Sequence, residues 1–210
     1  MKLQTAIDRL KVRLSGAVSD PVEFRGEVTL TVSREKIVPA CEFLKKECGF
    51  DMLTDLSGVD NYGEDPRYEV DYLLYSLAER CHLRLKVRVS EDDMIVDSVT
   101  SVWRGADWHE REAFDMFGIR FRGHPNLKRI LMWEGYPHHP LRKDFPLAGL
   151  PADLPATAQN AGMVQPAPME GGPFVAGIGM VGAPRREPRA NDTAAERDER
   201  TAHPGHQEDI

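Results

Sequence analysis

The sequence predicts an α+β protein in which helices pack against a mixed or antiparallel sheet, so that the domain has two layers. Over residues 3–14, apolar side chains recur every three or four positions, which is the spacing of one face of a helix. Apolar and polar side chains alternate over residues 68–74 and again over residues 83–89, which is typical of half-buried strands. Helices near the start and a later run of strands together indicate a two-layer α+β domain.

The first half of the chain is expected to contain two helices and a strand. The first helix covers residues 3–14, and a strand follows over residues 28–32, where apolar side chains alternate with threonines. A second helix is predicted over residues 37–48, with Gly49 as its end. Pro39 must then lie in the first turn of that helix, because a proline further along would remove a hydrogen bond and bend it.

The middle of the chain is expected to be mostly strands. A strand is predicted over residues 50–56 and a loop over residues 58–66. The strands at 68–74 and 83–89 then form a hairpin, with partly acidic side chains on the outer face of one and basic side chains on that of the other. Antiparallel pairing would set these opposite charges across from each other. Residues 94–103 are expected to form either a strand or a short helix.

A third helix is predicted over residues 108–117, a stretch without glycine, proline or β-branched side chains. Asp107 is expected to cap its N-terminus and Gly118 to end it. Arg111 and Asp115 lie four residues apart, so they are expected to form an ion pair on one flank of the helix.

A basic segment, called here the basic strap (residues 119–149), follows this helix. Between residues 119 and 146 it holds six arginine or lysine residues against two acidic ones, whereas the whole chain has a net charge of −7. Its four prolines push the residues before them toward extended conformations. Opposite charge and an extended backbone predict that the strap lies along the surface of another protein chain.

The third helix and the strap carry a resemblance to a known family. The residues concerned are Glu110-Arg111-Glu112, Asp115-Met116-Phe117, His124, Lys128, Ile130 and Leu131, followed by the sequence HPLRKDFP at residues 139–146. In order and spacing they resemble the signature of the 30 kDa subunit, also called the C subunit, of proton-translocating NADH-quinone oxidoreductase, respiratory complex I. The resemblance covers about residues 1–149.

The resemblance implies a peripheral-arm subunit that has no catalytic, cofactor-binding or metal-binding residue of its own. The NADH, FMN, iron–sulfur clusters and quinone of such a complex are held by other subunits. The implied partners are the quinone-site subunit, also called the D subunit, and the neighbouring iron–sulfur subunits, at the cytoplasmic face of the bacterial inner membrane. Structural and interface roles are expected for ten residues, called here the signature residues: Glu110, Arg111, Glu112, Asp115, His124, Lys128, Arg129, Arg142, Lys143 and Asp144.

Two other functions compete with this one. Related subunits occur in membrane-bound hydrogenases and in complexes fed by ferredoxin, and the sequence does not separate these electron donors. A free-standing metal-dependent hydrolase would instead use His109, Glu112 and His124 as ligands. That site is disfavoured, because Arg111 and the arginines after Gly118 would repel a cation.

Composition narrows the remaining classes. A net charge of −7 argues against a general nucleic-acid-binding protein. No apolar run approaches the roughly 20 residues that span a bilayer, and the N-terminus has no signal-peptide pattern. The three cysteines, Cys41, Cys48 and Cys81, form no CxxC pair and are expected to be reduced, buried thiols.

The chain is expected to divide into three parts. An α+β domain occupies residues 1–118 and the basic strap occupies residues 119–149. Residues 150–210 are rich in glycine and proline and show no sustained helical or strand period. We therefore expect a tail that is irregular or disordered by itself and folds, if at all, against a partner.

Overall fold

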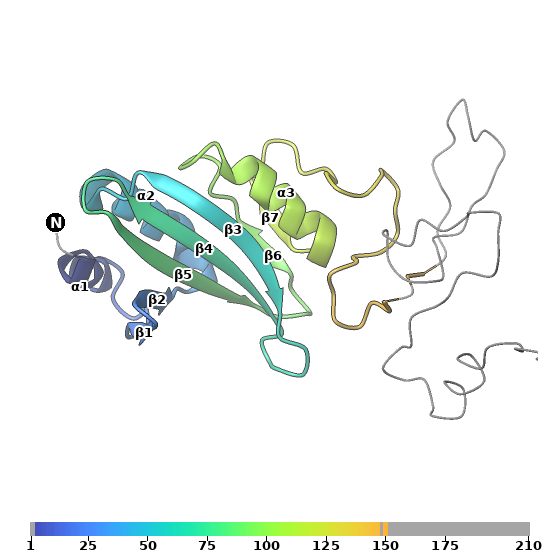
Figure 1. Ribbon diagram of the computed structural model, residues 1–210, viewed down its shortest axis with the longest axis horizontal. Coiled ribbons are helices and arrows are strands. Elements are labelled where there is room, and N and C mark those ends of the chain that lie inside the picture. The colour runs from blue at the N-terminus through green and yellow to red at the C-terminus, as the bar shows by residue number, and fades with distance from the viewer. Residues whose placement is uncertain (1–2, 148, 151–210) are drawn as a thin grey trace, which may run out of the picture.

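The computed structural model describes residues 3–147 and 149–150, and Figure 1 shows a sheet flanked by helices and followed by the basic strap. The prediction of an α+β domain with a mixed sheet packed by helices is confirmed. In chain order the elements are α1 (Leu3–Arg13), β1 (Val22–Phe24), β2 (Glu27–Thr31), η1 (Arg34–Lys36), α2 (Ile37–Cys48), β3 (Met52–Asp60), β4 (Tyr68–Ser76), β5 (Cys81–Val89), β6 (Ile95–Asp97), α3 (Ala106–Phe117) and β7 (Arg120–Arg122).

The main sheet has five strands in the order β1-β2-β5-β4-β3. β2 and β5 run parallel and all other neighbours are antiparallel, so the sheet is mixed. A parallel pair needs a long connection, and here α2 and the β3–β4 pair supply it. β6 and β7 form a second, parallel sheet of two strands.

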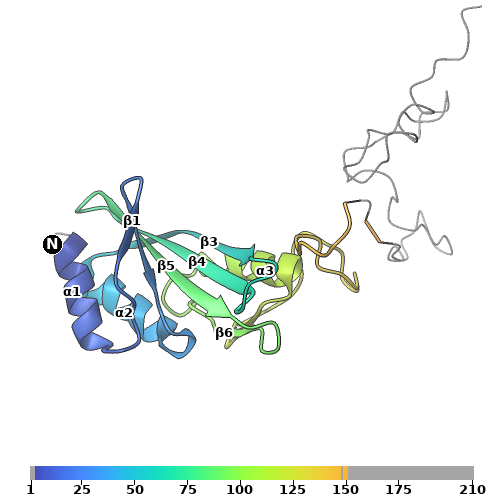
Figure 2. The same cartoon turned by 90° about the horizontal axis from the view of Figure 1, so that it is seen from below.

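The helices cover one face of the main sheet. On β4, the alternating side chains of Tyr68, Val70 and Tyr72 are fully buried. Tyr72 lies close enough to Cys41 of α2 and Glu110 of α3 that both act electrostatically on it, so both helices pack on this face. Figure 2 shows α1 and α2 toward one end of the sheet and α3 toward the other.

The predicted β4–β5 hairpin and its cross-strand charges are confirmed. Asp71 lies opposite Lys86, and Glu69 lies opposite Arg88. The Nζ of Lys86 is 2.7 Å from a carboxylate oxygen of Glu69 and 3.6 Å from one of Asp71. These ion pairs lie on the face of the sheet that α2 and α3 do not cover, where alternating charged residues were expected.

β3 is longer than predicted, so the loop expected over residues 58–66 is wrong for its first three residues. The strand predicted at residues 50–56 runs instead from Met52–Asp60 and pairs with β4 along its whole length. Glycine usually weakens a strand. At Gly58, however, a Cβ atom would lie only 2.6 Å from Cδ2 of Phe117, so the glycine is what allows α3 to pack on β3.

The predictions for the first half are largely confirmed. Pro39 is the third residue of α2, and Gly49 ends that helix with a φ of 75°. β2 lies one residue earlier than the strand predicted over residues 28–32. β1 was not predicted: it pairs with β2 through a two-residue turn at Arg25-Gly26, where both φ angles are positive.

α3 begins at Ala106, two residues before its predicted start, and Gly105 occupies the capping position. The prediction of Asp107 as the N-cap is therefore wrong. Asp107 lies inside the first turn, where its carbonyl oxygen and its Oδ1 are each 3.3 Å from Nε2 of His124. Gly118 ends the helix as predicted, with a φ of 85°.

The segments on either side of α3 pair with each other. Of the two structures expected within residues 94–103, the strand forms, as β6. It runs parallel to β7, which is the start of the basic strap. Ile119 and Phe121 are buried in the core, so the strap begins as a strand that packs on the domain.

The cysteines are free thiols, as expected. Cys41 and Cys48 are buried, whereas Cys81 is only half-buried and thus more exposed than predicted. Burial raises the pKa of Cys41 well above its usual range, which keeps that thiol protonated. Within the described residues, no helix is long and apolar enough to cross a bilayer.

Candidate interaction site

The basic strap lies against the C-terminal half of α3. The backbone N–H of Leu141 donates to the carbonyl of Met116 at 3.2 Å, and Nε of Arg142 donates to the carbonyl of Phe117 at 2.7 Å. The last carbonyl groups of a helix have no partner within the helix. The strap supplies those partners, so the helix end and the strap stabilise each other.

Asp115 is the centre of these contacts, and its side chain is fully buried. Its Oδ2 accepts hydrogen bonds from the backbone N–H groups of Ile130, Leu131 and Met132, at 3.0, 2.8 and 2.8 Å. Its Oδ1 pairs with Arg129 at 2.5 Å. Burial by itself would raise the pKa of Asp115, but these hydrogen bonds outweigh it and the pKa is lowered. The carboxylate is therefore charged and fully supplied with donors.

Arg111 does not pair with Asp115, so the ion pair predicted within α3 is wrong. Its Nε donates to the carbonyl of Lys128 at 3.1 Å, and its Nη2 donates to the carbonyl of Arg129 at 3.2 Å. Its guanidinium also lies over the ring of Trp108, 5.3 Å from the centroid. Strap donors already fill the oxygens of Asp115, so Arg111 binds the strap backbone instead.

His139 fixes the far part of the strap to the same helix. Its Nδ1 lies 2.9 Å from the carbonyl oxygen of Asp115, which can only accept, so Nδ1 carries a proton. Its ring packs edge-on against Phe114. Burial lowers the pKa of His139, and nearby arginines act in the same direction. His139 is thus half-buried against α3.

A second ion cluster joins the end of the strap to the sheet. Arg67, just before β4, forms a bidentate ion pair with Asp60, in which Nε donates to Oδ1 and Nη2 donates to Oδ2, each at 2.8 Å. Nη2 of Arg67 also lies 2.7 Å from Asp144. Its Nη1 lies 2.8 Å from Glu91, and the backbone N–H of Lys143 donates to Asp60 at 2.7 Å. Hydrogen bonds from Arg67 lower the pKa values of Asp60 and Asp144.

Glu110 ties α3 to the segment after β6. Its side chain is fully buried, and it accepts hydrogen bonds from the backbone N–H of Val99 and the hydroxyl of Ser98, both at 2.7 Å. Burial raises its pKa to about 7, and the nearby charge of Asp107 acts in the same direction. Nε2 of His124 lies 4.0 Å from Oε2 of Glu110, so this histidine closes the same buried cluster.

The remaining signature side chains are exposed. Glu112, Lys128 and Lys143 lie at the surface. The two lysines contribute through backbone groups to the joint, which is the name used here for the contact of the strap with α3 and the sheet. The signature residues therefore divide into those that hold the strap on α3 and those that point outward from it.

The alternative metal site is not assembled. Nδ1 of His109 lies 3.3 Å from Asp55 of β3, whereas His124 faces Asp107 and Glu112 is exposed. In the part of the chain that the structure describes, no three His, Cys, Asp or Glu side chains come together in a way that could hold a metal ion. The geometry therefore gives no support to the hydrolase hypothesis.

Three residues of this site were not predicted: Asp60, Arg67 and His139. Asp60 and Arg67 lie seven residues apart, on either side of a loop, and this spacing has no meaning until β3 and β4 pair. His139 opens the HPLRKDFP sequence, so that motif was the signal that could have identified it.

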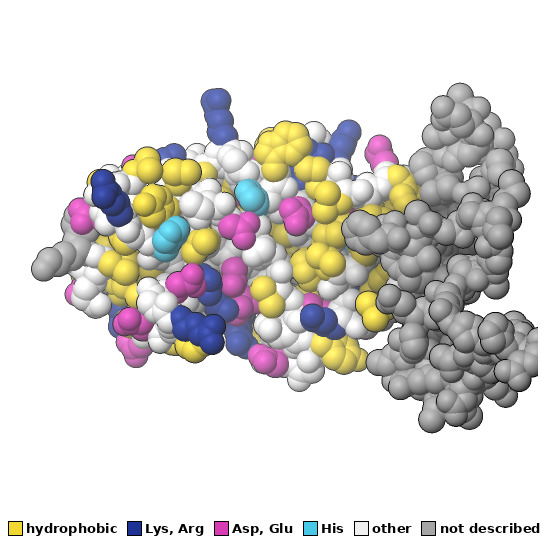
Figure 3. All heavy atoms as spheres, in the orientation of Figure 1, with side chains coloured by type: hydrophobic (Ala, Val, Ile, Leu, Met, Phe, Trp, Pro, Cys, Tyr) yellow, Lys and Arg dark blue, Asp and Glu magenta, His cyan; other side chains and the backbone are white. Residues whose placement is uncertain are grey.

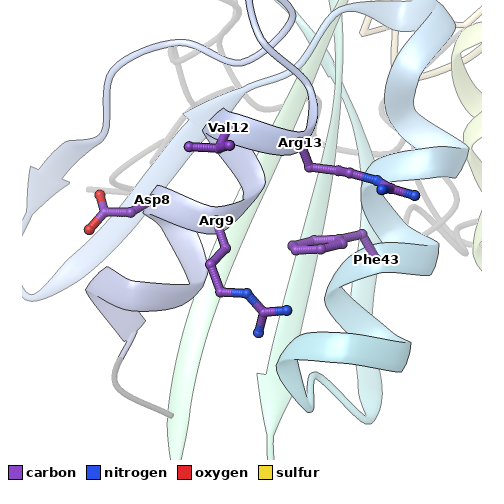
Figure 4. A pocket seen from close by; sticks show the side chains of 5 residues that line it. All are labelled: Asp8, Arg9, Val12, Arg13 and Phe43. Atoms are coloured by element: carbon purple, nitrogen blue, oxygen red, sulfur yellow. The ribbon is translucent and has the colours of Figure 1, made fainter.

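One pocket lies away from the signature residues. A pocket of 350 Å³ between α1 and α2 is lined by the five residues in Figure 4. Figure 1 shows α1 at the opposite end of the domain from α3. The face in Figure 3 carries charges of both signs among hydrophobic side chains. The contact between α3 and the strap is therefore the candidate site.

The fold and this site define a class of protein: an α+β domain that holds an extended basic strap on one of its helices. The buried charged residues of the site are bonded to the chain itself and shape a surface, and that surface presents further signature side chains. The family follows from comparison: the family described as respiratory-chain NADH dehydrogenase, 30 Kd subunit, matches residues 30–151, which is more than half of the chain. The chain belongs to this family, as the signature predicted.

Curated relatives agree with this assignment. A protein of Citrifermentans bemidjiense, named as the C subunit of NADH-quinone oxidoreductase, is 47% identical over 144 residues, which cover 69% of this chain and 89% of that protein. A protein of Rhizobium meliloti, named as C subunit 2 of NADH-quinone oxidoreductase, is 49% identical over 154 residues, covering 72% and 84% of the two chains.

Solved structures share the fold. The trypsin-resistant fragment of Nqo5 superimposes with a TM-score of 0.53 at 29% identity, covering 60% of this chain and all of that one. A chain of the membrane-bound sulfane sulfur reductase, an archaeal respiratory membrane complex, superimposes with a TM-score of 0.57 at 22% identity, covering 69% and 85%. The second likeness is one of fold alone.

Proposed function

We propose that this chain is a structural, non-catalytic subunit of an NADH-quinone oxidoreductase complex and that it acts by holding other subunits together. One observation carries the proposal: Asp115 and Arg129, two of the signature residues, form the buried ion pair at the centre of the contact that fixes the strap on α3. Residues that hold a surface segment in place are expected in a subunit that acts by contacting other subunits.

The exposed side of the same joint supports an interface role. Trp108 on α3 and Leu131, Leu141 and Leu147 on the strap are between 51% and 90% exposed. Large apolar side chains that are exposed to solvent are suited to contact with another protein. The proposed partners are the quinone-site (D) subunit and the neighbouring iron–sulfur subunits.

The proposed division of labour leaves electron transfer to the other chains. NADH, FMN, the iron–sulfur clusters and the quinone are bound by partner subunits, and this chain keeps those subunits in register at the cytoplasmic face of the bacterial inner membrane. Glu110, Asp115 and Arg67 support this role, because each is engaged by hydrogen bonds within the chain.

A mild pull-down tests the proposal. The tagged chain is recovered from detergent-solubilised membranes, and its partners are identified by mass spectrometry. We expect the quinone-site and iron–sulfur subunits, and we expect no NADH-dependent quinone reduction by the purified chain alone. Quinone reduction by the chain alone, or recovery of hydrogenase subunits in place of the NADH-oxidising ones, would contradict the proposal.

A further inference from the structure

Two acidic residues of β4, Glu69 and Asp71, lie on the face of the main sheet that α2 and α3 do not cover. Figure 1 shows α2 behind β4 and β5, so the viewer looks onto this face. Residues two positions apart on a strand point to the same side, so the two carboxyl groups are neighbours. Both are largely removed from water, since the side chain of Glu69 is 5% exposed and that of Asp71 is 18% exposed. Two like charges that are buried side by side need compensation.

The nearest cation serves one of the two acids. The Nζ of Lys86 on β5 donates to Oε1 of Glu69 at 2.7 Å, whereas it lies 3.6 Å from Oδ2 of Asp71, beyond hydrogen-bonding distance. On the other side of β4, Ser57 lies opposite Asp71 and Val59 lies opposite Glu69. Neither of these β3 residues carries a charge, so β3 does not compensate the pair.

The two arginines of β5 on this face are shared with other acids. Arg84 pairs with Glu27 of β2. Arg88 lies 3.3 Å from Glu64 and 3.6 Å from Glu69. In this group, four acids of the described chain therefore meet three cations, and one carboxylate is left without a hydrogen-bonded cation.

The Oδ1 atom of Asp71 is the acceptor that is left over. It is buried, and within the described residues it receives no hydrogen bond. A water molecule or a side chain of another protein cannot reach a buried atom, but a proton can lie between two neighbouring carboxyl groups. Burial raises the pKa of Asp71 to about 6. Lys86 and Arg84 oppose this rise in the pKa, whereas the charge of Glu69 and a hydrogen bond to it add to the rise.

We infer that Glu69 and Asp71 bind one proton between them, so that the hydroxyl of a protonated Asp71 donates to the carboxylate of Glu69. The proton removes one of the two like charges, and Glu69 keeps its hydrogen bond from Lys86. It is taken from solvent and returned to solvent, and no other group has to change. The uncovered face of the sheet therefore gains one negative charge when the proton leaves, so any chain that docks there meets a surface whose charge depends on pH.

The variant Asp71→Asn tests this inference, because an asparagine amide can donate to Glu69 without binding a proton. The pKa of Asp71 is raised on folding, so the stability that its proton contributes is full at low pH and is lost as the pH rises through about 6. Between pH 5 and pH 7, the ratio of folded to unfolded protein should therefore rise roughly tenfold for Asp71→Asn relative to the parent chain.

Urea unfolding of both proteins at the two pH values measures this ratio. Glu110 is present in both, so its own titration cancels in the comparison. Glu23→Gln is the control, because it removes an exposed acid from β1 of the same sheet, and it should follow the parent chain. If the ratio for Asp71→Asn stays constant or falls, Asp71 acts as a charged partner of Lys86 and the inference is wrong.

Carbon-13 NMR of the carboxyl groups locates the proton in the unaltered chain and does not depend on the folding of a variant. We expect the resonances of Asp71 and Glu69 to shift together, with a midpoint near pH 6. In Asp71→Asn, the shift of Glu69 at this pH should be lost. A midpoint near pH 4 for Asp71, which is the ordinary value of an aspartate, would overturn the inference. A shift of Glu69 that persists in Asp71→Asn would show that the proton is not shared and would overturn it as well.

Discussion

The Oδ1 atom of Asp115 on α3 lies 2.5 Å from the guanidinium of Arg129, fourteen residues later in the strap, and the side chain of Asp115 has no exposed surface. This pair joins a regular helix to a segment without regular structure. Its removal would leave Arg129 and three backbone N–H groups without their acceptor, so the attachment of the strap depends on it.

We expect Asp115→Ala to lower the free energy of unfolding by about 3–5 kcal/mol, because a buried charge and its donors lose their partner. Glu112→Ala is the matched control, since Glu112 is an exposed acid on the same helix, and it should change stability by less than about 0.5 kcal/mol. Urea unfolding measures both. Since the pKa of Asp115 is lowered on folding, its contribution is present at neutral pH and is lost as the pH falls below about 4.

Arg111→Ala should destabilise the protein more than Arg88→Ala. Arg111 donates to two strap carbonyls, and loss of such charged donors costs about 1–3 kcal/mol. Arg88 lies 3.3 Å from Glu64 at the surface and 3.6 Å from the buried Glu69, which keeps Lys86 as a closer partner at 2.7 Å. The Arg88 side chain is 43% exposed, so its loss costs about 0–1 kcal/mol. Equal melting temperatures and equal yields of complex for the two variants would show that Arg111 does not hold the strap.

Glu110 should make stability depend on pH. Burial raises its pKa from 4.5 to about 7, so between these values the folded chain holds a proton that the unfolded chain has released. The free energy of unfolding contributed by this group is therefore highest below about pH 4.5, and it falls as the pH rises to about 7, by up to about 3 kcal/mol. Asp60 and Asp115 have lowered pKa values, so they change the free energy of unfolding only at a lower pH than Glu110 does.

Glu110→Gln is expected to remove this dependence. Urea unfolding at pH 5 and pH 8 should show a fall in stability for the parent chain and a smaller one for the variant. Asp107 and His124 face the same carboxyl group, so His124→Asn separates the contribution of the imidazole. A variant that keeps the full pH dependence of the parent would show that Glu110 does not cause it.

Gly58→Ala should destabilise the packing of α3 on β3. The added methyl group would lie 2.6 Å from Cδ2 of Phe117, and overpacking of this kind costs about 1–3 kcal/mol. Gly105→Ala is the control, because Gly105 has a φ of −62° and open space around it. Thermal unfolding should show a loss for the first variant and no loss for the second. A larger loss for Gly105→Ala than for Gly58→Ala would contradict the close contact between Gly58 and Phe117.

The structure describes the α+β domain and the strap but not the tail proposed from the sequence. Residues 150–210, apart from the first, lie outside the described residues, so the glycine- and proline-rich tail stays a prediction. The strap does lie along a surface, but the one it covers here is that of α3 in the same chain, and its contact with a partner remains a proposal.

The sequence by itself determined the elements whose cause is local. α1, α2, α3, β4 and β5 follow from the spacing of apolar side chains, and Gly49 and Gly118 end their helices as predicted. The family signature is local in the same sense, because it is a set of residue types at short, ordered spacings.

Tertiary structure decided which groups bond to each other. Arg111 was expected to pair with Asp115 on the same helix, but Asp115 takes its donors from residues fourteen to seventeen positions later. Gly58 lies in a strand because it pairs with Val70 of β4, and its missing side chain leaves room for Phe117 of α3. A buried carboxylate takes whichever donors the folded backbone brings to it, and three consecutive N–H groups and a guanidinium satisfy it better than one helix neighbour. That choice depends on where the strap returns to the helix, and the spacing of residues along the chain does not contain this information.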